Sequence, residues 1–402
     1  MATLVIGLSS LMVVRIERRS AGQSADFSEA QGYAHSAIEM GMLMLRNDYD
    51  WRTTVSPGVW AARKPIGRGY YSLNAIDPSD NNFGNNASDH VVFIGTGEVN
   101  EARYKLSVEL EPYGLPGMDF LASAVHTSTH ARVDGMVTVD APISSNGTIG
   151  IEIGAVVRGD VEAVGDIFLN GALVGTATEG ISPKEVPTEA VIDYYIAQAV
   201  AIDISSIPKK SGCHEVARVV ISPASNPFGA ATHPQGLYLI DCKNEKICIR
   251  DSRIQGSLVL LDPGSGSEVG GAIQWAPFDP LLPALLVRGP FGFAWSGPLL
   301  EAGLPPVNFN PPGSPSGGAA DVDVLDVYPG SMRGLIMISG DLLVETADDV
   351  TGVILCLGRE LHVKSTLVVH HDPALIAAPP PGFERAYRAM TPIAGSWKQV
   401  VD

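Results

Sequence analysis

Few side chains in this sequence have the types and spacing that catalysis or metal binding requires. His126 and His130, in the segment HTSTH, stand four residues apart, a spacing that suits one metal ion when it falls on a helix. The Thr and Ser residues between them favour a strand or a loop, so we expect no metal site here. His370 and His371 end a predicted strand beside Asp372, and we expect this group to cap the strand at the surface.

The segment DPSDNNFGNNASD, from Asp77 to Asp89, is rich in carboxylate and amide oxygens, the ligands that calcium prefers. The ligand spacing of an EF-hand loop is absent. We therefore expect an ordinary solvated loop, with a calcium site as the alternative.

The cysteines suggest neither a zinc ribbon nor a thioredoxin-type redox site, because none of the four lies in a C-x-x-C pair. Cys242 and Cys248 flank the segment KNEKI, and their spacing permits a disulfide across a small hairpin in an oxidising compartment. Cys356 lies in the aliphatic segment GVILCLG, where we expect a buried thiol that packs as a small apolar side chain.

Sequence motifs for nucleotide binding or hydrolysis are also absent. There is no P-loop, no G-x-S-x-G elbow and no H-E-x-x-H helix, and GSGSEVGG (Gly264–Gly271) has the wrong spacing for a dinucleotide fingerprint. An enzyme built on short stacked strands would need charged side chains from consecutive strands. The strands GLIMIS, GVILCLG and GSLVLL carry almost none. We expect a non-enzymatic protein with no cofactor and no metal.

Composition sets the class of protein that must hold these residues. The chain has 402 residues, which predicts two or three structural units, and its 45% apolar residues exclude a mainly disordered protein. Its 43 Gly and 29 Pro predict many turns and few long helices. The net charge of −17 argues against nucleic acid as a partner, because phosphate binding needs clustered Lys and Arg.

The N-terminal segment predicts one long helix. Residues Met1–Val14 are uncharged and are followed by Arg15, Arg18 and Arg19, while apolar residues recur at helical spacing between Phe27 and Leu45. We expect a helix from about Thr3 to Arg46. The uncharged run is short for a membrane span, which needs ~20 residues. A signal-peptide core and a buried helix are alternatives, but the basic residues follow the run, which favours a membrane anchor that is shortened at its start.

The rest of the chain is predicted to be mainly β-structure. Segments 67–77, 90–99 and 102–112 alternate apolar and polar residues and predict three antiparallel strands against the second half of the helix. From Val133 to Gly175, very short strands are punctuated by Gly, and this pattern returns in segments 254–262, 334–345 and 350–369. Such repeats favour a parallel β-helix, with a β-sandwich as the alternative.

We therefore predict an α+β, mainly β protein in which a long N-terminal helix and a small antiparallel sheet precede a β-solenoid. A helix predicted over Glu189–Ala201 is expected to cover an open flank or end of the solenoid. Segment 308–330 is expected to be a long loop. Phe383 and Trp397 are expected to anchor an extended tail. The predicted units are residues 1–50 (anchor and assembly helix), 51–118 (sheet), 119–378 (solenoid, with the helical insert near 187–202) and 379–402 (tail).

The helix followed by DFSEAQGYAHSAIEMGMLMLRND resembles the N-terminal region of PilX-type minor pilins and of the large minor pseudopilin of type II secretion. The downstream segments GLIMISGDLLVE, GVILCLGRELHV and HHDPALIAAPPPGF are similar to Gly-punctuated solenoid tails on such pilins. In those tails the strand ends in YDP, whereas here it ends in HHDP. The resemblance covers most of the chain and lies in the order of the segments more than in single residues.

The resemblance implies a subunit held in the inner membrane by its helix, with the body in the periplasm or at the cell surface. The implied partners are other pilin-like subunits, membrane lipid, and a polysaccharide or secreted protein. Val5 stands where major pilins carry Glu, which fits an initiating or tip subunit. The residues expected to contact membrane or neighbouring helices are Leu4, Val5, Ile6, Leu8, Leu11, Val13, Val14, Phe27, Ala34 and Ile38.

Two other functions remain open from the sequence. One is a carbohydrate-active β-helix protein, which would require a groove lined by at least two carboxylates, or by an Arg–Lys set, on neighbouring strands. The other is a self-assembling solenoid scaffold, in which hydrophobic end coils stack between chains.

Overall fold

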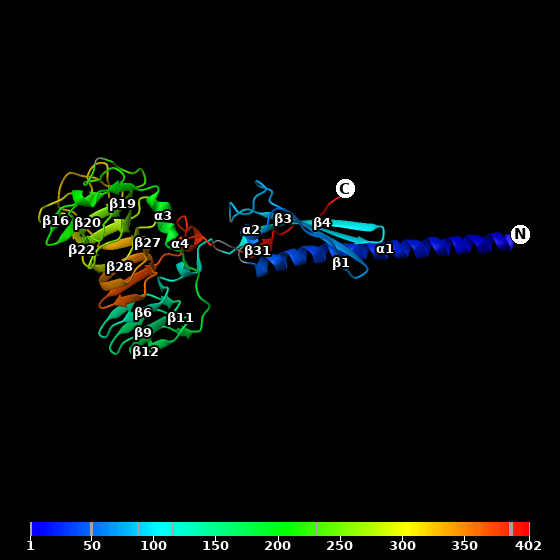
Figure 1. The fold of residues 1–402 in the computed structure, drawn as a ribbon, viewed down its shortest axis with the longest axis horizontal. Helices are drawn as coiled ribbons and strands as arrows, with labels where there is room; N and C mark the ends of the chain where they lie inside the picture. Colours follow the sequence, from blue (N-terminus) through cyan, green and yellow to red (C-terminus); the bar gives the residue numbers. More distant parts are fainter. Residues whose placement is uncertain are drawn as a thin grey trace. The chain divides into compact units, whose positions relative to one another are not determined.

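The computed structural model describes residues 2–48, 51–86, 88–114, 116–229, 231–385 and 389–401; of residues 2–10 and 389 it describes the backbone only. The chain forms two compact units, residues 1–115 with 385–402 and residues 116–384 (Figure 1). A long helix with an antiparallel sheet makes up the first unit, and stacked parallel strands make up the second. This confirms the predicted α+β, mainly β class.

The first unit begins with one unbroken helix, α1 (Ala2–Asn47), followed by the short α2 (Trp51–Thr54). The bounds of α1 agree with the predicted helix to within a residue, since no Pro interrupts the segment. Its C-terminal half buries one stripe at helical spacing, which consists of Ala30, Ala34, Ala37, Ile38, Gly41 and Leu45.

The sheet of the first unit is antiparallel, with the strand order β1 (Gly58–Ile66), β2 (Gly69–Ile76), β3 (Val91–Val99), β4 (Ala102–Tyr113) and β31 (Ala389–Pro392). A further strand, β32 (Lys398–Gln399), also pairs with β4. β2, β3 and β4 are the three predicted strands. The C-terminal residues return to this sheet, so the tail belongs to the first unit.

Glycines let α1 approach the sheet closely. A Cβ on Gly97 would lie 1.9 Å from the carbonyl oxygen of Ala30, and one on Gly95 would lie 2.2 Å from that of Ala34. Small residues on the helix and on β3 therefore meet backbone to backbone. This contact explains why the β3 segment reads FIGTGEV instead of a continuous run of large β-formers.

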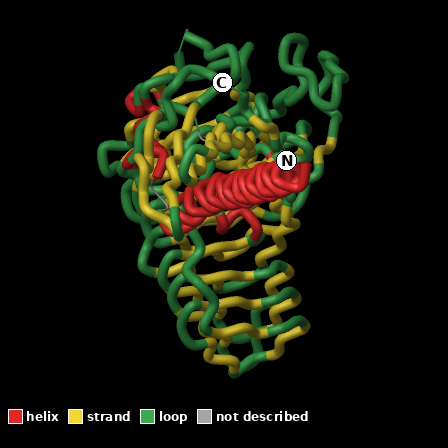
Figure 2. The backbone as a smooth tube through the Cα atoms, turned by 90° about the vertical axis from the view of Figure 1, so that its right-hand side faces the viewer, coloured by secondary structure: helices red, strands yellow, loops and turns green. Residues whose placement is uncertain are grey.

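The second unit is a parallel β-solenoid with three faces, and Figure 2 shows its coils as stacked rungs. The helix-covered face contains β14 (Ala177–Glu179), β11 (Val161–Ala163), β8 (Ile143–Ser145), β5 (Val125–Thr127), the C-terminal parts of β28 (Leu342–Cys356) and β27 (Ser331–Ile338), β23 (Leu285–Arg288), β21 (Ser257–Leu261), β19 (Leu237–Asp241) and β15 (Val200–Ile202).

The open face contains β12 (Ile167–Leu169), β9 (Thr148–Ile151), β6 (His130–Val133), β29 (Glu360–Val363), the start of β28, β24 (Phe291–Trp295), the starts of β22 (Glu268–Ala276) and β20 (Ile247–Gln255), and β17 (Cys213–Ala217). A short strand, β16 (Lys209–Lys210), pairs antiparallel with β17.

The loop-covered face contains β13 (Ala172–Val174), β10 (Val156–Arg158), β7 (Thr138–Asp140), β30 (Leu367–His371), the middle of β28, the start of β27, the ends of β22 and β20, and β18 (Val220–Ile221). All of the pairings that stack these coils are parallel, which favours the predicted solenoid over the β-sandwich.

The coils are not stacked in chain order. The chain enters the solenoid at β5, runs outward to the end coil β12–β14, and then crosses to the far end at β15. From there it returns coil by coil until β28, β29 and β30 pair with β5, β6 and β7. The strand β6 consequently pairs with β29, which lies far along the chain, and in Figure 1 the cyan strands lie next to the orange ones.

Two of the three faces are covered. On the helix-covered face, α3 (Ala190–Ile196), α4 (Ala374–Ala377) and the 3₁₀ turn η1 (Asp119–Ala122) pack on outward aliphatic side chains such as Val259 and Met337. On the loop-covered face, an excursion with β25 (Leu299–Leu300) and β26 (Val327–Tyr328) packs around Phe309. Strands buried on both sides explain the continuous aliphatic runs in the sequence.

The predicted helix over Glu189–Ala201 is shorter than expected. It ends at Ile196, because Val200–Ile202 forms β15, and a second 3₁₀ turn, η2 (Ile204–Ser206), follows. The helix buries Val191, Ile192 and Tyr195 against the outer surface of the strands and does not cover their edges.

Candidate functional site

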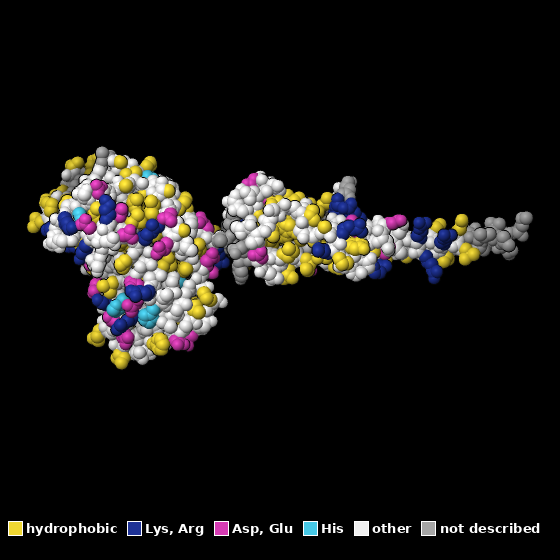
Figure 3. Space-filling model, viewed as in Figure 1, with side chains coloured by type: hydrophobic (Ala, Val, Ile, Leu, Met, Phe, Trp, Pro, Cys, Tyr) yellow, Lys and Arg dark blue, Asp and Glu magenta, His cyan; other side chains and the backbone are white. Residues whose placement is uncertain are grey.

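The exposed half of α1 is the first candidate interaction surface. Leu11, Met12 and Ile16 are 70%, 67% and 67% exposed, and Val13 and Val14 are also exposed. Arg15, Arg18 and Arg19 are exposed on the same stretch, and Figure 3 shows apolar and basic side chains alternating along it. A solvated helix would gain by burying this apolar surface, so the stretch is suited to contact with another apolar surface.

The residues expected to contact membrane or neighbouring helices fall into three groups. The side chains of Leu4, Val5, Ile6 and Leu8 lie outside the described part of the structure, so their contacts stay predictions. Leu11, Val13 and Val14 are exposed. Phe27, Ala34 and Ile38 face the sheet instead: the Phe27 ring lies edge-on to Tyr104, and Ala34 and Ile38 are fully buried.

Within the described residues, no helix combines the length and the apolar character needed to cross a membrane.

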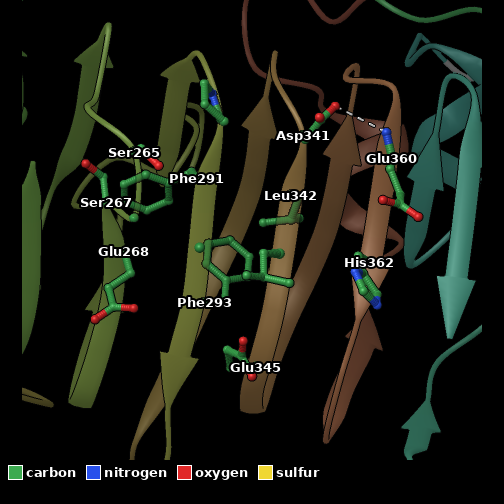
Figure 4. A pocket seen from close by; sticks show the side chains of 14 residues that line it. Ser265, Ser267, Glu268, Phe291, Phe293, Asp341, Leu342, Glu345, Glu360 and His362 are labelled. Atoms are coloured by element: carbon green, nitrogen blue, oxygen red, sulfur yellow. Dashed lines mark hydrogen bonds between the residues drawn. The ribbon is translucent and has the colours of Figure 1, made fainter. Parts of the chain in front are cut away.

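A groove on the open face of the solenoid is the second candidate site. Pairing across four strands places Glu268 beside Gly292, Gly292 beside Leu343, and Leu343 beside His362. The cavity is about 300 Å³, and Figure 4 shows Phe293 and Leu342 along its floor with acidic side chains around them. The turn before β22, part of the segment GSGSEVGG whose spacing excludes a dinucleotide fingerprint, lines one side of it.

Ion pairs surround the groove on the open face. Glu345 lies 3.2 Å from the ammonium group of Lys364, and Asp341 lies 2.9 Å from the guanidinium group of Arg359. Partial burial of Asp341 favours its neutral form, but the Arg359 guanidinium and backbone N–H donors outweigh that effect and hold the pKa of Asp341 below its ordinary value. Of the groove's acidic groups, Glu360 carries no such paired cation among the described ion pairs. The groove therefore presents ion pairs, together with the carboxylate of Glu360, above an apolar floor.

The charged surface continues from the groove onto β6 and β9. His362 lies 2.9 Å from Asp134, and the guanidinium of Arg132 lies 3.1 Å from Asp134 and 3.8 Å from Glu152. Figure 3 shows acidic, basic and His side chains gathered over this part of the solenoid. Opposite charges on adjacent strands at this spacing stabilise the pairing of the strands and make the surface polar.

Sequence reasoning missed this surface, because it rested on the aliphatic strands of the helix-covered face. The segment RELHVK carries the missed signal: Glu360, His362 and Lys364 alternate with Leu361 and Val363. Period-two alternation of charged and apolar residues indicates a strand with one solvated face.

The structure separates the two histidines of HTSTH. His126 lies on β5 in the helix-covered face and is fully buried, whereas His130 lies on β6 in the open face. Each ring bonds a hydroxyl of the next coil, with 2.7 Å between the His126 and Ser144 atoms and 2.7 Å between the His130 and Thr148 atoms. The two imidazoles therefore do not share a metal site. His371 bonds the carbonyl oxygen of Leu121 at 2.7 Å.

The predicted Cys242–Cys248 disulfide is wrong. Cys248 is bonded to Cys213, whose Cα lies 6.1 Å from its own, and both Cys242 and Cys356 are buried free thiols. Cys213 and Cys248 lie on β17 and β20, which pair as neighbours in the open face. The bridge therefore joins two adjacent coils, a proximity that comes from the solenoid repeat and not from the short spacing of a hairpin. Burial raises the pKa of the Cys242 thiol to about 12.

No family model matches the sequence, and no curated protein matches it. The chain is similar to the solved structure of the competence-associated pilin ComZ from Thermus thermophilus, with 9% identity, a TM-score of 0.36, and coverage of 93% of this chain and 98% of that chain. It is also similar to an ice binding protein from an Antarctic Biological Consortium, with 12% identity, a TM-score of 0.26, and coverage of 64% and 92%. At these TM-scores neither likeness assigns a function.

Proposed function

We propose that this protein is a non-catalytic, pilin-like structural subunit. Its helix α1 assembles with the helices of other pilin-like subunits, and its solenoid presents a surface to a partner outside the cytoplasm. The finer proposal is a PilX-type minor pilin or the large minor pseudopilin of a type II secretion filament, in an initiating or tip position.

The observation that carries the proposal is the division of α1 into two environments. The stretch from Ala30 to Leu45 packs on β3 through small residues, whereas the stretch from Leu11 to Ile16 exposes its apolar side chains. A helix that served only the sheet would gain nothing from exposed aliphatic side chains that precede the part packed on the sheet. Those side chains are stabilised once they are buried against lipid or another apolar helix.

Two further features support a location of the body outside the cytoplasm. The disulfide between Cys213 and Cys248 is typical of proteins that fold in an oxidising compartment. Residues Met1–Val14 carry no charge, which suits lipid contact at the start of the helix. The proposed location is the inner membrane, with the body in the periplasm or at the cell surface.

Site-specific photocrosslinking tests the assembly role. A benzophenone side chain at position 13, in the exposed half of α1, is expected to crosslink to the helix of a second subunit in cells that express the full gene. The same group at position 59, on the edge strand β1, is the control, because Val59 is 69% exposed but lies away from that half of the helix.

Fractionation of the same cells provides the second readout. The protein, expressed with its upstream coding region, is expected in the membrane or filament fraction. Full recovery in the soluble fraction together with equal crosslinking at positions 13 and 59 would contradict the proposal.

The groove on the open face favours a second candidate function, recognition or cleavage of a polysaccharide. Glu268, Glu345 and Glu360 come from three different strands and line one groove, as a carbohydrate-active β-helix protein requires. Cleavage would further need a carboxylic acid kept protonated by a desolvated environment. The Glu345 side chain is 50% exposed and paired with Lys364, which favours binding over catalysis.

Glycan arrays and hydrolysis assays separate these outcomes. Binding to a polysaccharide that is lost in Glu345→Gln with Glu360→Gln, without release of reducing ends, would support a binding groove. Release of reducing ends by the unaltered protein, lost in the same double variant, would establish an enzyme and overturn the non-catalytic proposal.

A further inference from the structure

The loop between β2 and β3 brings three carboxylates together. Asp77, Asp80 and Asp89 each offer one oxygen, and these three oxygens all lie within 4.8 Å of one another. Three like charges at this separation repel one another. A cluster of acidic residues is common on protein surfaces, so its meaning depends on whether the carboxylates are solvated.

Asp77 is not solvated. The residue is 3% exposed, and it comes directly after the last residue of β2. One carboxylate oxygen, Oδ1, accepts hydrogen bonds from the backbone N–H groups of Ser79, at 2.7 Å, and Asp80, at 3.4 Å. The other oxygen, Oδ2, is buried and accepts no hydrogen bond from the described part of the chain. A buried carboxylate oxygen without a donor is costly unless a cation contacts it.

The loop around the cluster is held in place by its own side chains and by a buried arginine. The Arg52 guanidinium donates hydrogen bonds to the backbone carbonyl oxygens of Asn86, at 3.1 Å, and Asp89, at 2.7 Å. Phe83 is buried below the loop, where its ring packs edge-on to Trp51 and Trp60. The backbone that carries Asp77 and Asp89 is therefore organised by contacts of its own.

We propose that Asp77, Asp80 and Asp89 bind one calcium ion. All of the candidate ligands are oxygens, which is the preference of hard divalent cations and excludes a thiolate or imidazole metal site. Calcium accepts irregular coordination that is completed by amide oxygens and water, both of which a loop rich in Asn can supply, whereas magnesium demands near-ideal octahedral geometry. The bound ion neutralises the buried Asp77 and fastens the loop between β2 and β3. The calcium alternative for this loop is thus favoured over the ordinary solvated loop.

Isothermal titration of the full chain in detergent with calcium chloride alone tests the proposal. We expect one calcium ion per chain, with a dissociation constant on the order of 10⁻⁴ M or tighter, and no saturable binding of magnesium at the same concentrations. Calcium is also expected to raise the midpoint of thermal unfolding of the first unit, and removal by a chelator is expected to reverse the shift.

Two variants make the assignment specific. Asp77→Asn removes the buried charge at constant shape. Because a change at a buried residue can also affect folding, the double variant Asp80→Asn with Asp89→Asn provides an independent test at less buried positions. Both are expected to lose calcium binding and the thermal shift, while Glu101→Gln, an exposed acidic residue of the same sheet, retains both. Absence of saturable binding to the unaltered chain, or binding that survives in both variants, would overturn the site. Either result leaves the crosslinking test of α1 unaffected.

Discussion

His126 shows how one position of a solenoid strand changes character from coil to coil. It pairs with Leu355 on one side and with Ser144 on the other, and Ser144 pairs in turn with Glu162. The outward row of the helix-covered face thus changes from aliphatic to polar. The hydroxyl of Ser144 bonds that of Ser123 at 2.8 Å.

The buried network continues to a surface ion pair. The Lys184 ammonium donates to Ser123 at 2.6 Å and lies 2.9 Å from Glu162. Burial, with a smaller contribution from the positive charge of Lys184, lowers the pKa of His126 to about 3. The imidazole is therefore neutral in the folded protein at all but strongly acidic pH.

This burial predicts a pH-dependent loss of stability. The ordinary pKa of histidine is 6.5 and that of folded His126 is about 3, so between these values the unfolded chain binds a proton that the folded chain does not. The contribution of neutral His126 to the free energy of unfolding is complete above pH 6.5. This contribution falls as the pH drops toward 3, by up to about 1.4 kcal/mol per pH unit. Denaturant unfolding at about pH 7 and about pH 4.5 should show a smaller loss for His126→Gln than for the unaltered protein. His370→Gln, at an exposed position, should behave like the unaltered protein, and equal losses in all three proteins would refute the prediction.

At the scale of elements, the packing of α1 on β3 depends on glycines, because a side chain at their positions would clash with the helix. Gly97 faces the carbonyl oxygen of Ala30 so closely that any side chain would displace the helix. By contrast, Gly32 lies on the exposed side of the same helix, and a methyl group added there would meet nothing within 4 Å. Alanine at position 97 would therefore clash with the helix backbone, whereas alanine at position 32 would meet no other atom.

We expect Gly97→Ala to destabilise the first unit by about 1–3 kcal/mol, because the added methyl group meets backbone that cannot move without shifting α1. Gly32→Ala should instead stabilise the helix by about 0.5–1 kcal/mol, since alanine loses less backbone entropy. Thermal unfolding followed by circular dichroism measures both. A Gly97→Ala protein as stable as the Gly32→Ala protein would mean that the helix does not pack on β3 as described.

The end coil is the element where self-assembly of the solenoid would start. Among the described residues, β12, β13 and β14 each pair with a neighbouring coil on one side only. Phe168, Leu169 and Val174 are exposed on these strands. Exposed edges of this kind invite pairing with another chain. One edge donor is already occupied, because the Glu179 carboxylate accepts the backbone N–H of Ile167 at 2.7 Å.

Replacing Glu179 by Ala should promote end-to-end association, because it frees the Ile167 donor and removes a charge from the edge. In detergent that keeps α1 monomeric, sedimentation velocity should show concentration-dependent oligomers for Glu179→Ala but not for Glu101→Ala, whose residue lies on the other unit. Monodisperse behaviour of Glu179→Ala would show that the carboxylate does not protect the edge. Association of the unaltered chain would instead favour the scaffold function.

At the scale of the whole second unit, the folded structure depends on contacts between segments that are distant in the chain. The first coil, which contains β5, cannot complete its pairing until β28 has formed, and β28 lies far along the chain near the end of the solenoid. The Cys213–Cys248 bridge, with a sequence separation of 35, constrains the far part of this assembly.

The bridge is expected to contribute about 2–4 kcal/mol to the stability of the solenoid by restricting the unfolded chain. The double variant Cys213→Ser with Cys248→Ser should unfold at a lower denaturant concentration than the unaltered protein. Reductant should lower the midpoint of the unaltered protein and leave that of the double variant unchanged. Sensitivity of the double variant to reductant would place the effect on another thiol.

Local patterns were enough to predict the long helix, the strands β2 to β4, the parallel solenoid and the fold class, because helical spacing and Gly-punctuated alternation are properties of neighbouring residues. Spatial proximity decided the rest: the partner of Cys248, the return of the C-terminal strands to β4, the separation of His126 from His130, and the placement of Glu345 and His362 along one groove. These depend on which coil stacks on which. Several stackings bury the same aliphatic side chains, so the periodic pattern alone does not distinguish among them.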